Sequence, residues 1–115
     1  MIELELPYPP SANHYYRRLG PRTLISREGR RFRERVCAIL AAKILRPFDG
    51  PIAVQVDVHP PDRRRRDLDN TQKALLDALQ HGGVYRDDSQ IESLTIVRRS
   101  QVDGGRVHVA IRGME

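Results

Sequence analysis

The stretch Ile52-Ala53-Val54-Gln55-Val56-Asp57-Val58 decides the fold, because it is the clearest strand in the chain. Its large apolar residues stand at every second position, which is the pattern of a strand buried on one face. Pro60 and Pro61 close the strand. A helix is expected over Asn70–Gln80, with an apolar stripe and a Gly-Gly stop, and a second strand around residues 94–97. These elements predict a strand–helix–strand unit that crosses over right-handed.

Two more strands and one more helix lie outside this unit. Residues 2–6 and 107–111 alternate apolar with other residues, so both predict half-buried strands. A turn over residues 103–105 is expected to join the last two strands. Ser26 is the predicted N-cap of a helix that runs to about Leu45, because its apolar residues recur with helical spacing.

These elements follow one another in the order β-α-β-α-β-β, with an irregular loop expected over Pro7–Arg22. The predicted fold class is α+β: a mixed sheet of about four strands with two helices packed on one face. A chain of 115 residues suits a single domain, residues 1–115.

The composition is strongly basic. Twenty Lys and Arg against fifteen Asp and Glu give a formal net charge of +5, and the pI is about 10.0. This balance favours a nucleic acid or an anionic membrane surface as partner. No apolar run approaches the ~20 residues of a spanning helix, so no membrane span is expected. A lone cysteine, Cys37, forms no internal disulfide and fits a reducing cytoplasm.

Residues Asp62 to Lys73 read Asp-Arg-Arg-Arg-Arg-Asp-Leu-Asp-Asn-Thr-Gln-Lys, so four arginines run directly into two aspartates. Arginine matches phosphate, and carboxylate oxygens are ligands that Mg²⁺ prefers. An extended backbone here would turn Asp67 and Asp69 outward and Leu68 inward. The loop therefore predicts a Mg²⁺ site beside a phosphate-binding segment, which is the combination that phosphodiester cleavage needs.

Two further elements would complete this site. The turn after the second helix carries Asp87-Asp88, and there the chain can fold back toward the start of that helix. One of this pair is the expected third ligand. Lys73 lies one helical turn after Asp69, so we expect it to hold the scissile phosphate or to stabilise charge in the transition state.

Simpler interpretations of the same residues remain open. Asp69 and Gln72 fit a capping box, Lys73 and Asp77 fit an ordinary surface ion pair, and the arginine run fits a solvated basic loop. The alternative functions are a non-enzymatic basic module that binds nucleic acid, and a general metal-dependent nuclease.

Three segments resemble the RusA-type Holliday-junction resolvases, a family of crossover junction endodeoxyribonucleases often carried by prophages. These segments are Leu6-Pro7-Tyr8-Pro9-Pro10-Ser11-Ala12-Asn13-His14-Tyr15-Tyr16-Arg17, Pro61-Asp62-Arg63-Arg64-Arg65-Arg66-Asp67-Leu68-Asp69-Asn70 and Gly83-Val84-Tyr85-Arg86-Asp87-Asp88-Ser89-Gln90-Ile91. The resemblance implies that Asp67, Asp69 and Asp88 coordinate Mg²⁺, with Lys73 as an essential neighbour. It also implies a homodimer that resolves four-way DNA junctions by paired nicks during recombination and repair. No small-molecule cofactor is expected.

Supporting roles are predicted for other polar residues. Arg63, Arg64, Arg65 and Arg66 should contact DNA phosphates. Asn13, Tyr15, Tyr16 and Arg17 lie on a proline-stiffened loop, where the tyrosines could stack beside unpaired bases at the junction centre. Both tyrosines could equally pack beneath that loop.

Overall fold

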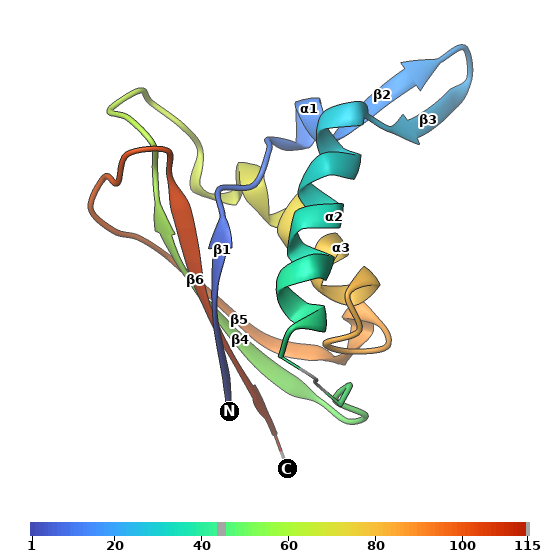
Figure 1. Ribbon diagram of the computed structural model, residues 1–115, viewed down its shortest axis with the longest axis vertical. Helices are drawn as coiled ribbons and strands as arrows, with labels where there is room; N and C mark the ends of the chain where they lie inside the picture. The colour runs from blue at the N-terminus through green and yellow to red at the C-terminus, as the bar shows by residue number, and fades with distance from the viewer. Residues whose placement is uncertain (44–45, 115) are drawn as a thin grey trace.

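A mixed four-stranded sheet forms the base of the molecule. The computed structural model describes residues 1–43 and 46–114. The sheet order is β1-β6-β4-β5, with bounds β1 Ile2–Pro7, β4 Ile52–His59, β5 Ile91–Arg98 and β6 Arg106–Gly113. β4 and β5 are parallel, and β6 is antiparallel to β1 and β4. Helices α2 (Arg27–Ala41) and α3 (Gln72–His81) lie on one face of this sheet (Figure 1).

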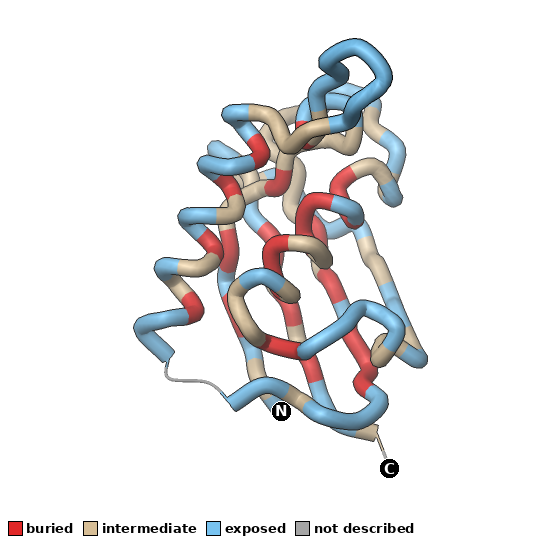
Figure 2. Tube along the Cα trace, turned by 90° about the vertical axis from the view of Figure 1, so that its right-hand side faces the viewer, coloured by how far each residue is buried: buried red, intermediate tan, exposed pale blue. Residues whose placement is uncertain are grey.

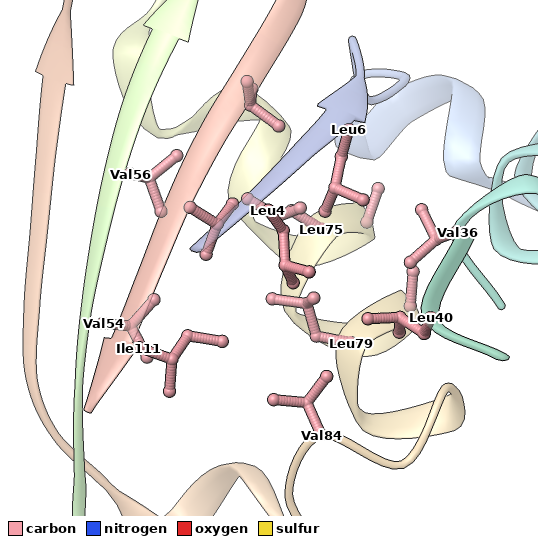
Figure 3. Packing of buried hydrophobic residues seen from close by; sticks show 14 of the residues in the cluster. Leu4, Leu6, Val36, Leu40, Val54, Val56, Leu75, Leu79, Val84 and Ile111 are labelled. Atoms are coloured by element: carbon pink, nitrogen blue, oxygen red, sulfur yellow. The ribbon is translucent and has the colours of Figure 1, made fainter. Parts of the chain in front are cut away.

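The predicted α+β class is therefore confirmed, and alternating strands supply one side of the core. Val54, Val56 and Val58 of β4 are buried, and the apolar positions of α2 and α3 pack above them (Figure 3). Figure 2 shows the buried residues gathered between the sheet and the helices. Ser26 is the N-cap of α2, as expected: its side chain accepts a hydrogen bond from the Gly29 amide. None of the described helices is long and apolar enough to cross a membrane.

The segment expected as an irregular loop is partly ordered, which corrects that prediction. A one-turn helix, α1 (Ala12–Tyr15), leads into a hairpin of β2 (Tyr16–Leu19) and β3 (Arg22–Ile25). This hairpin, called the arm below, projects away from the sheet and helices (Figure 1). Most of its residues are exposed, so it lacks the apolar alternation by which a strand is recognised.

Two predicted boundaries also change. α2 ends at Ala41 rather than near Leu45, and residues 44–45 lie outside the described residues. α3 begins at Gln72 rather than Asn70, because a 3-10 turn, η1 (Leu68–Thr71), precedes it.

The turn over residues 103–105 does not join neighbouring strands. The predicted turn is present at residues 103–104 between β5 and β6, but β6 pairs with β1 and β4, so the connection passes the end of β4 and closes no hairpin. Gly104 and Gly105 both have positive φ, and a side chain at Gly105 would meet the Tyr8 ring. Glycine is needed here because the turn is left-handed and also packs closely on β1's exit.

Candidate active site

The basic loop is held by its own aspartate. Asp62 accepts hydrogen bonds from both terminal nitrogens of the Arg66 guanidinium, at 2.5 and 3.0 Å, and from the Arg64 amide at 2.9 Å. The Arg66 guanidinium also lies over the Tyr8 ring, 5.9 Å from its centroid. From β5, Arg98 donates to the Arg66 carbonyl at 2.6 Å. The residue before Asp67 is thus fixed from three sides.

This arrangement divides the four arginines into two groups. Hydrogen bonds from Arg66, and then from the Arg64 amide, hold the pKa of Asp62 well below its usual range, so the carboxylate stays charged and keeps its hold on Arg66. Arg63 and Arg65 are exposed, and within the described ranges their side chains have no ion-pair partner. We therefore assign Arg66 mainly to positioning the loop, while Arg63 and Arg65 remain available for phosphate.

Asp67 and Asp69 both point to solvent, although the backbone is not extended throughout. Asp67 is extended, with φ −74° and ψ 135°, whereas η1 begins at Leu68. Leu68 packs against the core and both aspartates are exposed. The predicted inward leucine between two outward acids is therefore confirmed, and the extended backbone at Leu68 and Asp69 is wrong.

The structure contains neither the Asp69–Gln72 capping box nor the Lys73–Asp77 ion pair. The N-cap position of α3 is Thr71, and no Asp69 capping hydrogen bond is formed among the described residues. Asp77 pairs with Arg33 of α2 at 2.7 Å instead of with Lys73. Lys73 is exposed, one turn from Asp69, and its side chain pairs with none of the residues that the structure describes.

Asp77 also accepts a hydrogen bond from the Tyr15 hydroxyl, which ties α1, α2 and α3 together. Burial would raise the pKa of Asp77, but the hydrogen bonds from Tyr15 and Arg33 bring it below its ordinary value. Burial, and then the Asp77 carboxylate, raise the pKa of Tyr15.

Tyr15 is fully buried, so the packing alternative holds for it and its predicted DNA contact is corrected. Tyr16 packs edge-on against the Tyr15 ring, with centroids 4.9 Å apart, yet remains partly exposed. Asn13 and Arg17 are exposed on α1 and the arm. Contacts from these three residues to DNA stay predictions.

Asp87 and Asp88 are neighbours in the chain but differ in their contacts. Asp87 is the N-cap of the 3-10 turn η2 (Asp88–Gln90): its carboxylate accepts from the Ser89 amide at 3.0 Å, and Gln90 completes a capping box. Hydrogen bonds from Ser89 lower the pKa of Asp87. Asp88 is exposed and takes no part in this cap. The geometry therefore singles out Asp88 as the acid free to bind a ligand.

Four aspartates have no hydrogen-bond or ion-pair partner among the described residues. Five aspartates of the described chain are engaged by hydrogen bonds or ion pairs: Asp49, Asp57, Asp62, Asp77 and Asp87. Asp67, Asp69 and Asp88 are not, and the turn residue Asp103 is the fourth. Unengaged carboxylate oxygens are the donor set that a hard cation such as Mg²⁺ takes. Within residues 1–43 and 46–114, however, no three potential metal ligands lie close enough together to hold an ion.

Two grooves meet at Asp67. One, of about 480 Å³, runs between the β1 exit and α2, where Arg31 and Arg35 line it. The other, of about 540 Å³, is lined by the arginine loop and by Arg98. Tyr8, Arg66, Asp67 and Thr71 belong to both. The exposed carboxylate of Asp67 thus stands between two arginine-lined channels.

Several contributors were not found from the sequence. Asp62 and Arg66 stand four residues apart just after a proline pair, and this spacing could have indicated the ion pair between them. Tyr8 and Arg98 gave none, because their role arises only when distant segments of the chain come together.

Comparison with known proteins agrees with this geometry. The chain matches the family model described as endodeoxyribonuclease RusA over residues 7–112. It is 42% identical over 112 residues to a protein of Enterobacteria phage 82 named crossover junction endodeoxyribonuclease rusA, covering 96% of this chain and 93% of that protein. The RusA protein of Escherichia coli K12, with the same name, is 41% identical over the same coverage. A relative from Enterobacteria phage HK97 is 41% identical over 111 residues, covering 96% and 92%.

Proposed function

Because this chain belongs to the RusA family of endodeoxyribonucleases, we propose that it is a crossover junction endodeoxyribonuclease. Its substrate would be a four-way DNA junction, which it resolves by paired, symmetric nicks during recombination and repair. We further propose that it acts as a Mg²⁺-dependent homodimer in the cytoplasm.

One observation carries this proposal: an unengaged carboxylate, Asp67, stands where two arginine-lined grooves meet. A basic module that only binds nucleic acid gains nothing from uncompensated negative charge in its phosphate channel, since that charge repels phosphate. A bound divalent cation offsets most of this charge and offers open coordination positions to the oxygens of a scissile phosphate. The arrangement is therefore better suited to cleavage than to binding alone.

The residues would share the chemistry as follows. No three ligands lie close together in one copy, so Asp67 and Asp69 would hold the cation together with Asp88 of the partner subunit in the proposed homodimer. The cation supplies Lewis acidity and an activated water when bound. Lys73, exposed and one turn after Asp69, would donate to a non-bridging phosphate oxygen and stabilise charge developing there. The tie between Asp62 and Arg66 would keep Asp67 in place while substrate binds.

DNA contacts would extend from this centre along the grooves. Arg63 and Arg65, with partial help from Arg64, would neutralise phosphates on one side, and the α2 arginines would do so on the other. The exposed Asn13 and Arg17, together with the half-exposed Tyr16, would reach the DNA near the junction centre.

Cleavage of an immobile four-way junction in Mg²⁺ tests the proposal, with Asp67→Asn beside wild type. This substitution keeps size and hydrogen-bonding capacity but removes the ligand charge, so we expect junction binding to persist and cleavage to fall by at least ~10³-fold. Asp103→Asn, at another exposed and unengaged aspartate, is the matched control and should cut normally. Cleavage by Asp67→Asn at the wild-type rate would reject Asp67 as a ligand.

A substrate panel separates this function from its alternatives. Wild type should cut the four-way junction in preference to linear duplex, single-stranded DNA and RNA. A preference for linear DNA or RNA would indicate a general nuclease, and tight binding without cleavage in any divalent cation would indicate a binding module.

A further inference from the structure

The arm ends in a tight two-residue turn. β2 and β3 are antiparallel, and their last pair, Leu19 opposite Arg22, leaves Gly20 and Pro21 between the strands. Gly20 has a φ of +60°, which suits the first position of a type II′ turn, and the ring of Pro21 fixes the φ of the second. Because the proline ring removes rotational freedom here, the two residues that border the turn keep a fixed place on the arm.

The base of the arm is fixed to the rest of the molecule. Tyr15, directly before β2, is fully buried, and its hydroxyl donates to Asp77 of α3. The amide of Ser26, directly after β3, donates to the Tyr15 carbonyl at 2.8 Å. Tyr16 and Ile25, the first pair of the hairpin, pack against the core. Four residues of strand carry the tip about 13 Å beyond this base, so the tip projects at a set position (Figure 1).

The two faces of the arm differ in composition, because residues paired across a hairpin point to the same face. One face carries the pair packed on the core and then Arg18 with Thr23. The other face carries Arg17, Leu19, Arg22 and Leu24. On this second face each leucine stands opposite an arginine, and Leu19 at the tip is 56% exposed.

The arm is positively charged and carries no acid. Residues 12–27 include four arginines and neither Asp nor Glu. Within residues 1–43 and 46–114, the three arginines of its strands have no ion-pair partner. A polyanion is the partner that this charge fits.

Phosphate binding alone gives no reason for a leucine at the tip. A leucine carries no charge and makes no side-chain hydrogen bond, so Leu19 gains free energy only by covering apolar surface. DNA offers such surface on the faces of its bases, where the stack is interrupted, and proteins that enter it use apolar wedges such as leucine. An arginine-flanked leucine therefore fits DNA with an unstacked base step.

The arm rises beside the groove that contains Asp67. Ser11, directly before α1, and Glu28, in the first turn of α2, line the same groove as Asp67. These two residues stand on either side of the arm in the sequence, so both of its connections lie at this groove. DNA with a phosphate at Asp67 would thus pass beside the base of the arm.

Building on the proposed function, we propose that the arm is a wedge that recognises interrupted base stacking. Leu19 inserts between two bases at a branch point, and Arg17 and Arg22, on the same face, bind the phosphates on either side. A continuous duplex offers the same phosphates to the arginines but no open base step to Leu19. The arm therefore makes the protein bind branched DNA more tightly than linear duplex.

Binding in EDTA, where no cutting occurs, tests the wedge apart from catalysis. The probe is a four-way junction with 2-aminopurine at the branch point, because the fluorescence of this base rises when it unstacks. Wild type should raise the fluorescence and prefer the junction to linear duplex. Leu19→Ser should lose most of the rise and bind the junction roughly tenfold more weakly, since about half of a leucine's burial is lost. Its affinity for linear duplex should stay as in wild type.

Matched variants show whether the effect belongs to an apolar tip. Leu19→Met keeps an unbranched apolar side chain of similar volume and should behave as wild type in both measurements. Thr23→Ala changes an exposed residue on the opposite face of the same arm and should also behave as wild type. Unchanged junction binding by Leu19→Ser would overturn the wedge. An equal loss of affinity for junction and duplex would overturn it too, because Leu19 would then make a general DNA contact.

The position of the tip on the DNA is a second test. Leu19→Cys in a Cys37→Ala background, labelled with azidophenacyl bromide, should cross-link to nucleotides at the branch point. Cross-links spread evenly along the duplex arms would contradict insertion. A lower mass of Leu19→Ser than of wild type in light scattering would place Leu19 in a contact between copies, which also contradicts the proposal.

The wedge and the proposed function fail separately. Wild type that shows the fluorescence rise and its dependence on Leu19, yet cuts no junction in Mg²⁺, contradicts the nuclease and supports the wedge. Wild type that cuts junctions, while Leu19→Ser binds them as tightly as wild type, contradicts the wedge alone.

Discussion

Removal of the Asp77 carboxylate should destabilise the fold while leaving the proposed metal ligands untouched. Asp77→Ala deprives the Tyr15 hydroxyl, in a fully buried residue, of its acceptor, and Arg33 of its ion-pair partner. An unsatisfied buried donor costs about 1–3 kcal/mol. The Arg33 pair adds about 1 kcal/mol after screening, because both side chains are more than a quarter exposed, at 26% and 29%.

The expected loss is therefore about 2–4 kcal/mol, against a total stability of 5–15 kcal/mol typical of a domain. Urea unfolding followed by far-UV circular dichroism measures it. Asp49→Ala is the control, since its pair with Arg86 is 67% and 78% exposed and should be worth less than about 1 kcal/mol. In the double variant Tyr15→Phe/Asp77→Ala the loss should be about 1 kcal/mol smaller than the sum of the single losses.

Lowering the pH should reduce the stability difference between wild type and the Asp77 variants, because the pKa of Asp77 is lowered in the folded protein. A carboxyl whose pKa is lower in the folded protein stabilises it fully above its unfolded pKa of about 3.9 and progressively less below. The difference between wild type and Asp77→Asn should thus shrink as pH falls from about 5 to 3. Equal losses for Asp77→Ala and Asp49→Ala, or strict additivity with Tyr15→Phe, would refute this reasoning.

Three further outcomes are expected. Asp62→Asn should loosen the loop before Asp67 and slow single-turnover junction cleavage roughly tenfold or more, while junction affinity changes much less. An unchanged cleavage rate would show that the Asp62–Arg66 pair plays no part in positioning Asp67. Log affinity for a junction should fall with log salt at a slope of about −5 to −7 if six to eight phosphates are neutralised, and Arg65→Gln should flatten it by about 1; a flat wild-type response contradicts the basic channels. Gly29→Ala should lower stability by about 1–3 kcal/mol, because the added Cβ would lie 2.5 Å from the Tyr15 carbonyl oxygen. Gly50→Ala, with open space around it, is the control in thermal melts.

The sheet and its two helices could be predicted because their signals are local. Alternating apolar residues predict β4, and a serine N-cap followed by apolar residues at helical spacing predicts α2. The arm gave no such signal, since five of its eight strand residues are exposed and apolar residues do not alternate along its strands. The strand order could not be predicted either, because the position of β6 between β1 and β4 depends on pairing between residues far apart in sequence.

The site could be predicted in its residues more than in its assembly. Asp67, Asp69 and Lys73 are close in sequence, so a local reading was enough to group them. The expectation that Asp88 folds back to join them treated the chain after α3 as a short turn, whereas η2 begins a parallel strand at the far end of the sheet. A parallel crossover places the two ends of its helix at opposite ends of the strands, so residues before and after α3 lie far apart in one copy.

The arm illustrates how this protein could acquire new preferences. It extends from the molecule, is attached through α1 and the buried Tyr15, and adds few side chains to the interior. Amino-acid changes along it should therefore leave folding and the acidic centre almost unaffected. If the arm binds DNA as proposed, substitutions along it would change which DNA structures the protein prefers without altering the proposed metal ligands.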